Sequence, residues 1–91
     1  MKAEKPTKVY VAVNVDFTDE GGMLPRSLVW EDGFEYEIDR VKDIRPSSAQ
    51  KAGGQGDRYT IVIKKQESFL FFEHNPVYGH KNPGRWFVER R

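Results

Sequence analysis

The sequence contains no cysteine among its 91 residues. Disulfides and thiolate metal sites are therefore excluded, and folding has to rest on apolar packing and backbone hydrogen bonds. Long apolar runs are also absent: the longest is the four-residue segment 69–72, whereas a membrane-spanning helix needs about 20 apolar residues. Residues 1–6 are polar and lead into no apolar segment. We therefore expect neither a signal peptide nor a membrane span, and we expect the protein to be cytoplasmic.

An excess of charge of one sign is missing as well. The chain has 15 Lys and Arg residues against 14 Asp and Glu residues, which gives a net charge of +1. Domains that grip phosphate backbones tightly usually carry a clear basic excess. Binding of nucleic acid, if it occurs, is therefore predicted to be weak and to depend on a local basic patch.

The residue types that carry most catalytic and metal chemistry are scarce. His74 and His80 are the only histidines, and no local spacing brings them together with a carboxylate, so we expect no metal and no other cofactor. The serines lie outside any nucleophile-elbow pattern. Glu35, Glu37 and Asp39 alternate with apolar residues, which predicts a solvated strand face rather than an acid–base pair. We therefore expect that the chain is not an enzyme.

Alternation of apolar and polar residues is what the sequence does have. Between residues 9 and 17 every odd position is apolar, and this period of two predicts a strand with one buried face. Similar patterns predict five further strands at 23–30, 34–39, 58–64, 69–72 and 86–88. Helical periodicity is missing, apart from a possible short helix at 47–51. The expected fold is all-β, with about six antiparallel strands in a curled sheet or small SH3-like barrel.

The length predicts one domain. Residues 1–7 are expected to form a flexible N-terminal segment, and residues 8–91 a single small β-barrel domain. The alternation loses its phase after Asp39, which predicts a bulge or bend near 39–40. Stretches rich in Pro, Gly and Ser predict loops at 46–57 and 75–84.

The core is expected to form from apolar residues on one side of each strand. Because aromatic side chains make up 13% of the sequence and each buries a large area, they should contribute much of this core. The expected core residues are Val11, Val13, Leu28, Trp30, Phe34, Tyr36, Ile38, Ile61, Ile63, Phe71 and Val88.

Two segments are apolar on both faces, namely 69–72 and the Trp86–Phe87 pair. Their side chains cannot all point inward unless both sides of the sheet are covered. Leu70, Phe72 and Phe87 are therefore predicted to form an exposed patch. An exposed patch of this kind marks a surface for a protein partner or for self-association.

Basic residues accompany a glycine-rich segment and the aromatic residues around it. The segment 51–56 lies between Arg45 and Arg58, so that free backbone N–H groups flanked by cations could hold an anion. The spacing is not that of a phosphate-binding loop, and a flexible connection between two strands is the simpler interpretation of the segment. Arg45, Lys51, Arg58 and Lys64 are the predicted contacts to an anion or to nucleic acid.

Several short motifs resemble a group of short uncharacterised bacterial proteins of similar length. They are Val29-Trp30-Glu31-Asp32-Gly33, Tyr36-Glu37-Ile38-Asp39-Arg40-Val41, Lys51-Ala52-Gly53-Gly54, Arg58-Tyr59-Thr60 and Arg85-Trp86-Phe87-Val88-Glu89. The likeness covers nearly the whole chain from Val9 onward. The Trp-x-x-Gly-x-x-Tyr-x-x-x-x-Val core is also similar to SH3-like small barrels, which implies a fold and no activity.

Two functions therefore remain open. The first is a non-enzymatic interaction module that binds a protein partner or itself through Leu70, Phe72 and Phe87. The alternative is weak binding of single-stranded DNA or RNA, with exposed rings stacking on bases beside Arg45, Lys51, Arg58 and Lys64.

Overall fold

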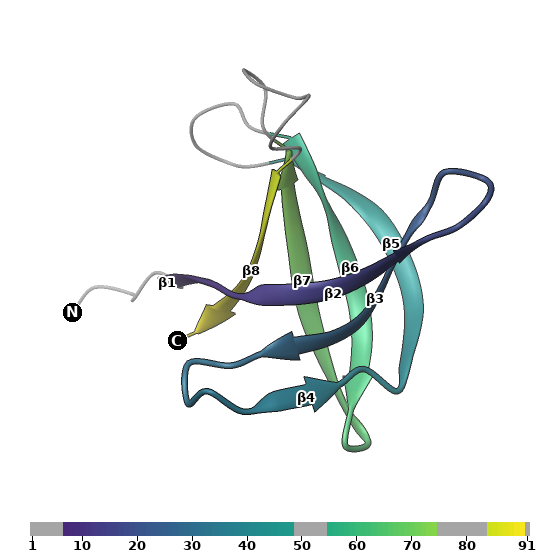
Figure 1. Cartoon of the computed structure of the whole chain (residues 1–91). Coiled ribbons are helices and arrows are strands. Elements are labelled where there is room, and N and C mark those ends of the chain that lie inside the picture. The colour runs from purple at the N-terminus through teal and green to yellow at the C-terminus, as the bar shows by residue number, and fades with distance from the viewer. Residues whose placement is uncertain (1–6, 49–54, 75–83, 91) are drawn as a thin grey trace.

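The computed structural model describes residues 7–48, 55–74 and 84–90, and in these ranges the chain consists of β-strands and their connections. Eight antiparallel strands form two sheets, one of five strands in the order β1-β8-β7-β6-β5 and one of three in the order β2-β3-β4 (Figure 1). The bounds are β1 (Thr7–Tyr10), β2 (Ala12–Phe17), β3 (Met23–Val29), β4 (Glu35–Glu37), β5 (Arg40–Ser48), β6 (Gln55–Ile63), β7 (Gln66–His74) and β8 (Gly84–Arg90). The all-β prediction is confirmed. The described strands do not close into a barrel.

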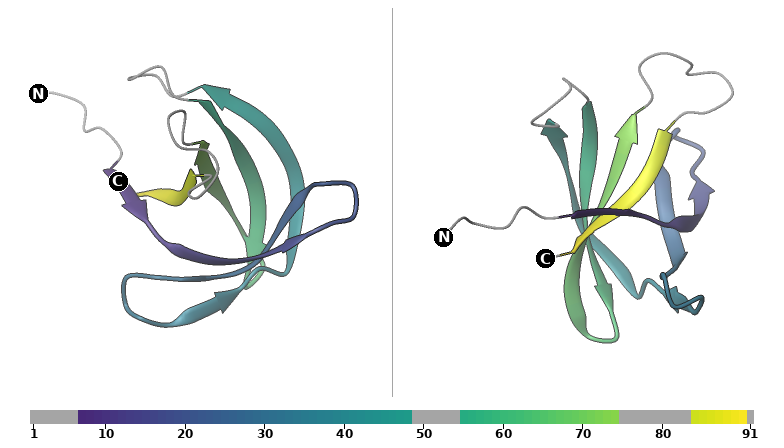
Figure 2. Two further views of the ribbon diagram at one scale, coloured as in Figure 1. Left: turned by 45° about the horizontal axis from the view of Figure 1, so that its top comes forward. Right: turned by 90° about the vertical axis from the view of Figure 1, so that its left-hand side faces the viewer.

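One of the six predicted strands, 9–17, is divided by a bend into β1 and β2, and β5 lies after the predicted strand 34–39, where no strand was predicted; together these raise the number from six to eight. The predicted bend near 39–40 is confirmed, because β4 ends two residues before Asp39 and β5 begins just after it. The other bend, at Val11 between β1 and β2, was not predicted. At each bend the chain passes from one sheet to the other (Figure 2). Backbone hydrogen bonds hold the two corners, from Val11 N to the Trp86 carbonyl at 3.0 Å and from Asp39 N to the Val62 carbonyl at 2.7 Å.

The predicted loop at 46–57 is shorter than expected. β5 continues to Ser48 and β6 begins at Gln55, and the two strands stay paired in register along this extension. The predicted short helix is therefore wrong for residues 47–48. Pro46 fits into β5 because this strand lies at the edge of its sheet. At an edge, a residue without an N–H group can occupy a position that need not donate a hydrogen bond to a neighbouring strand. Residues 49–54, and 75–83 of the second predicted loop, lie outside the described residues.

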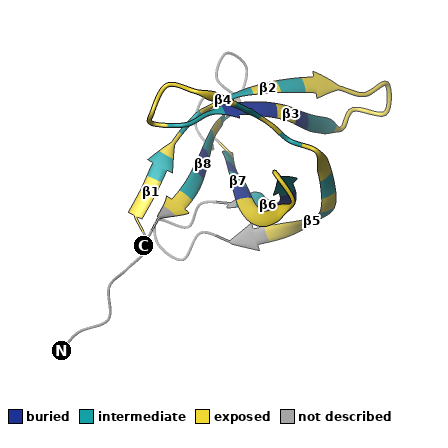
Figure 3. Ribbon diagram, turned by 90° about the horizontal axis from the view of Figure 1, so that it is seen from below, coloured by how far each residue is buried: buried dark blue, intermediate teal, exposed yellow. Residues whose placement is uncertain are grey.

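One buried cluster lies between the two sheets, and the dark segments of Figure 3 mark the strands that carry buried residues. It consists of Leu28 from the three-stranded sheet and of Tyr59, Ile61, Leu70 and Phe72 from the five-stranded sheet. Eight predicted core residues lie within or against this cluster. Two of them are buried members of it, Leu28 and Ile61. The other six pack around it: Val11, Val13, Trp30, Ile38, Ile63 and Val88.

Three predictions about the core need correction. Phe34 is 67% exposed, because it lies in the turn between β3 and β4 rather than on a paired strand. Tyr36 and Phe71 are only half-buried.

The assignment of Thr7 to a flexible N-terminal segment is also wrong, because this residue is the first of β1 and pairs with Arg90 of β8.

The turn between β6 and β7 carries backbone strain. Its two residues, Lys64 and Lys65, have φ values of 52° and 68°, the left-handed conformation that two-residue hairpins require and that glycine adopts most easily. We expect Lys65→Gly to stabilise the fold by about 0.5–1 kcal/mol, because it removes part of this strain. Urea unfolding of the variant measures the effect. Lys65→Ala is the control, since it removes the same charge and keeps the strain; a glycine variant no more stable than the alanine variant would contradict the prediction.

Candidate functional site

Four aromatic side chains cross the outward face of the five-stranded sheet, the face turned away from the core. We call Tyr10, Phe87, Phe71 and Phe69 the aromatic row. The register places Tyr10 of β1 opposite Phe87 of β8, and Phe87 opposite Phe71 of β7. The rings of Phe71 and Phe87 are stacked with centroids 5.0 Å apart, and the ring of Tyr10 meets Phe87 edge-on at 5.8 Å. Phe69 extends the row along β7, because residues two apart on a strand share a face.

The two ends of this row are open and its centre is packed. Phe69 is 48% exposed and Tyr10 is 40% exposed. Phe71 is half-buried, and Phe87 is buried by its neighbours in the row although it lies on the outward face. The row therefore offers ring surface to solvent at both ends.

Three cationic side chains lie over these rings. The guanidinium carbon of Arg85 is 3.4 Å from the ring centroid of Tyr10, and that of Arg58 is 4.7 Å from the centroid of Phe69. The ammonium of Lys8 lies 4.7 Å from the centroid of Phe87. Each such contact contributes about 0.5–1 kcal/mol at an exposed site. The result is a surface on which cations and rings alternate.

Glu73 of β7 anchors the Tyr10 end of the row. Its carboxylate accepts a hydrogen bond of 2.9 Å from the Tyr10 hydroxyl and forms an ion pair of 3.6 Å with Lys8. Partial burial, together with this carboxylate, raises the pKa of the Tyr10 hydroxyl above its usual value. Tyr10 therefore stays a neutral hydrogen-bond donor at physiological pH.

A second carboxylate, Asp43 of β5, lies near the Phe69 end. A hydrogen bond from the Thr60 hydroxyl, and then the nearby guanidinium of Arg45, lower the pKa of Asp43. The Arg45 Nε atom is 3.3 Å from Asp43 Oδ2. Arg58 Nε and Asp43 Oδ1 are both buried and make no hydrogen bond within the described part of the chain. The guanidinium of Arg58 packs over the ring of Phe69 instead.

The prediction of an exposed patch at Leu70, Phe72 and Phe87 is wrong. Leu70 is fully buried, Phe72 is 4% exposed and Phe87 is 7% exposed. The two faces of the segment 69–72 have the opposite roles to those predicted. Leu70 and Phe72 lie in the core, whereas Phe69 and Phe71 belong to the aromatic row. The exposed ring of this segment is Phe69.

Two of the four predicted cationic contacts come together. Arg45 and Arg58 are direct partners in the register of β5 and β6. Lys64 lies six residues beyond Arg58 in the β6–β7 turn, with its ammonium 5.2 Å from the ring centroid of Tyr36, and it does not join them. Lys51 and most of the glycine-rich segment lie outside the described residues.

Other functional residues of the aromatic row were missed by sequence reasoning. Tyr10 and Arg85 were not among the site residues predicted from the sequence. A strand pairing of β1 with β8 brings them together, and nothing in the order of residues along the chain fixes that pairing.

Glu35, one of the three carboxylates predicted on a solvated strand face, belongs to a cluster of hydrogen bonds that stabilises the three-stranded sheet. Glu35 Oε2 accepts hydrogen bonds from the Ser27 hydroxyl at 2.6 Å and from the Asn14 amide at 2.8 Å, and the same amide donates to Ser27 Oγ at 2.8 Å. These contacts tie β2, β3 and the start of β4 together. Ser27 is buried, so the cluster accounts for a polar side chain that would otherwise be unsatisfied.

Neither a metal-binding cluster nor a membrane-spanning helix is found among the described residues. They contain no group of three or more His, Cys, Asp and Glu side chains that could hold a metal ion. The Nε2 atom of His74 instead lies 3.3 Å from the Oδ2 atom of Asp57. Within the same ranges no helix is long and apolar enough to span a membrane.

The fold and this face define a small all-β protein with an aromatic and cationic sheet surface. No protein-family model matches the chain, and neither a curated protein nor a solved structure is significantly similar to it. The resemblance to short bacterial proteins therefore stays a prediction.

Proposed function

We propose that this protein binds single-stranded nucleic acid weakly through the outward face of its five-stranded sheet. The observation that carries the proposal is the aromatic row with an arginine over each open end. Proteins that bind single strands combine rings that stack on bases with cations that follow the backbone. Tyr10 with Arg85, and Phe69 with Arg58, each supply one such pair.

The two pairs favour a mode in which bases stack at the ends of the row. A base has a flat π-face that can lie on an exposed ring or on a guanidinium plane, irrespective of its identity. When a base covers the ring, the guanidinium that it displaces remains close enough to contact a phosphate of the same strand. Sequence preference is therefore expected to be low.

Electrostatics support weak rather than tight binding. The same face carries the cations Lys8, Arg45, Arg58 and Arg85, but also the carboxylates Asp43, Glu73 and Glu89, as the strand alternation and register show. Stacking must then supply much of the affinity. With two or three phosphate contacts, log Kd should change with log salt by a slope of about 1.5–2, because each contact on a single strand contributes roughly 0.7.

Fluorescence anisotropy of a labelled, mixed-sequence 12-nucleotide DNA tests the proposal. Tryptophan fluorescence is less suitable, because Trp30 and Trp86 both pack against the core. Saturable binding with a Kd of about 10–100 μM at physiological salt is expected. Phe69→Ala and Tyr10→Ala should each weaken it by about fivefold or more, since stacking contributes roughly 1–3 kcal/mol per base.

The control is Phe34→Ala, which removes a ring that is exposed but lies in the β3–β4 turn, outside the five-stranded sheet. It should leave Kd unchanged. The proposal fails if no saturable binding is seen at low salt, or if all three variants bind equally well.

The finer description of the fold belongs to the same proposal. We infer an SH3-like small barrel that is open between its sheets, because two chain segments, 7–17 and 35–48, each contribute strands to both sheets. A non-enzymatic, cytoplasmic protein fits this function. Association with a protein partner or a second copy would need a surface other than the buried Leu70, Phe72 and Phe87, and sedimentation of the free protein separates it from nucleic-acid binding.

A further inference from the structure

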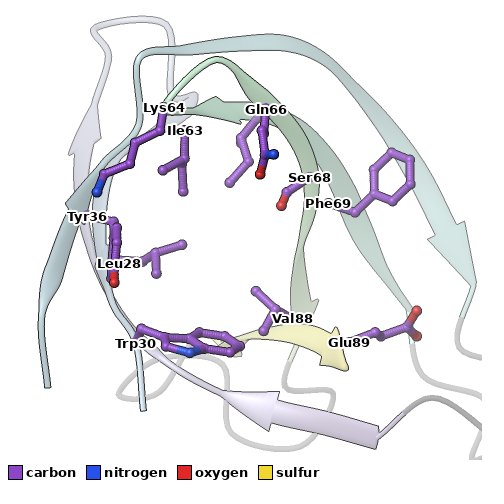
Figure 4. Close-up of a pocket in the computed structure, with 11 residues that line it drawn as sticks. Leu28, Trp30, Tyr36, Ile63, Lys64, Gln66, Ser68, Phe69, Val88 and Glu89 are labelled. Atoms are coloured by element: carbon purple, nitrogen blue, oxygen red, sulfur yellow. The ribbon is translucent and has the colours of Figure 1, made fainter. Parts of the chain in front are cut away.

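A cavity of about 450 Å³ lies on the inner side of the sheets, at the end where the β6–β7 turn is found (Figure 4). This volume is within the range of small-molecule sites. Its walls are apolar and come from both sheets. They are formed by Leu28, Trp30, Tyr36, Ile61, Ile63 and Val88.

The neutral polar side chains of the cavity lie on one side of it. Gln66 and Ser68, at the start of β7, point into it in Figure 4. Glu89 and Phe69 also line it, but both side chains point away from its centre. Alternation along the strands explains this, since their neighbours Val88 and Ser68 occupy the inner face.

Besides Glu89, Lys64 is the other charged residue among the described lining residues, and Figure 4 shows its ammonium at the rim, across the cavity from Gln66 and Ser68. The ammonium lies over the ring of Tyr36, itself a wall residue, with Nζ 5.2 Å from the ring centroid. The apolar cavity therefore has a cation at one side of its opening. This combination is complementary to a molecule with an apolar body and one anionic head.

We infer that the cavity binds a small monocarboxylic acid with an aliphatic or aromatic body. The body lies against Trp30, Leu28 and Val88, and the carboxylate lies at the rim, where it pairs with Lys64. Apolar burial supplies most of the binding free energy, at about 25 cal/mol per Å² of apolar surface removed from water. Lys64 supplies the preference for an acid over a neutral or cationic molecule of the same shape. This site shares Phe69 with the aromatic row, but it lies on the opposite face of the sheet and does not rest on the proposed function.

The test uses octanoate as the probe and two-dimensional ¹H–¹⁵N NMR of the full chain as the readout. Saturable shifts are expected for the indole N–H of Trp30 and for the backbone amides of residues 63–68. Octanol and octylamine, which share the apolar body, should bind at least fivefold more weakly. The amides of the aromatic row on β1 should not move.

Matched variants of the β6–β7 turn assign the role of the cation. Lys64→Gln should weaken octanoate binding by about fivefold, the effect of an exposed ion pair, and should leave octanol binding unchanged. Lys65→Gln removes the neighbouring charge, which does not line the cavity, and should bind octanoate normally. Ser68→Phe, which places a ring in the opening, should abolish binding of both probes.

Three results would overturn the inference: no saturable shift with octanoate, equal affinity for octanoate and octylamine, or equal loss in Lys64→Gln and Lys65→Gln. Nucleic-acid binding is a separate readout, because Tyr10→Ala changes the aromatic row and no residue of the cavity lining. Octanoate binding by this variant is expected to match that of the parent protein.

Discussion

Replacement of Leu70 by alanine is expected to destabilise the fold by about 3–5 kcal/mol. Leu70 is fully buried in the middle of β7, where it belongs to the cluster formed with Leu28, Tyr59, Ile61 and Phe72. Its truncation leaves a cavity between two sheets that the surrounding backbone ladders prevent from collapsing. A chain of 91 residues has a total stability of only about 5–14 kcal/mol, so this single change removes a large part of it.

Thermal unfolding of Leu70→Ala measures this effect, and the midpoint should fall by more than about 10 °C. Phe34→Ala is the matched control. It removes a larger apolar side chain from a position that is 67% exposed, and it should change stability by no more than about 0.5 kcal/mol. Similar losses in both variants would mean that the burial described for these two residues is wrong.

These two positions also show where sequence patterns were sufficient and where they were not. The alternation in 9–17 and 58–64 identifies strands and their buried faces, because one face of each strand is polar. Val13 and Ile61 were accordingly placed correctly. In 69–72 both faces are apolar, so alternation could not decide between them, and Leu70 and Phe72 were assigned to the surface.

At the turn between β3 and β4 the opposite error occurred, because an exposed residue was predicted to lie in the core. Phe34 follows Asp32-Gly33 and shares the alternation of Tyr36 and Ile38, which placed it in the core. In the structure the Phe34 N–H is bound to Asp32 Oδ1 at 2.9 Å, so that the turn extends through Phe34 and β4 begins only at Glu35. A local side-chain bond of this kind competes with strand pairing.

The candidate site depended on long-range pairing, which is why only part of it was predicted. Arg45 and Arg58 were predicted as contacts, and they face each other once β5 and β6 pair. The aromatic row also requires β1 to lie beside β8, at opposite ends of the described chain. Composition had indicated that rings and cations are interleaved, but only the register shows that Tyr10 and Phe69 are the rings open to solvent.

Close packing of backbones around β7 leads to the second large expected effect, for Gly56→Ala. Gly56 of β6 lies opposite Glu73, and a Cβ atom at this position would collide with the carbonyl oxygen of Phe72. Because β6 is hydrogen-bonded to β5 on one side and to β7 on the other, the backbone cannot move away without breaking a ladder. Gly84 of β8 approaches Glu73 in the same way from the other side of β7.

We expect Gly56→Ala to destabilise the fold by about 2–4 kcal/mol, the range for strain and displaced backbone in a packed region. Urea unfolding measures the change. Gly22→Ala is the control, because the added Cβ would meet only the Thr18 side-chain oxygen, at 3.2 Å in an exposed turn, and should cost less than about 1 kcal/mol. If Gly56→Ala were as stable as Gly22→Ala, β6 and β7 could not be as close at Phe72 as the structure places them. The register that aligns Arg58 with Phe71, and with it one end of the aromatic row, would then have to be different.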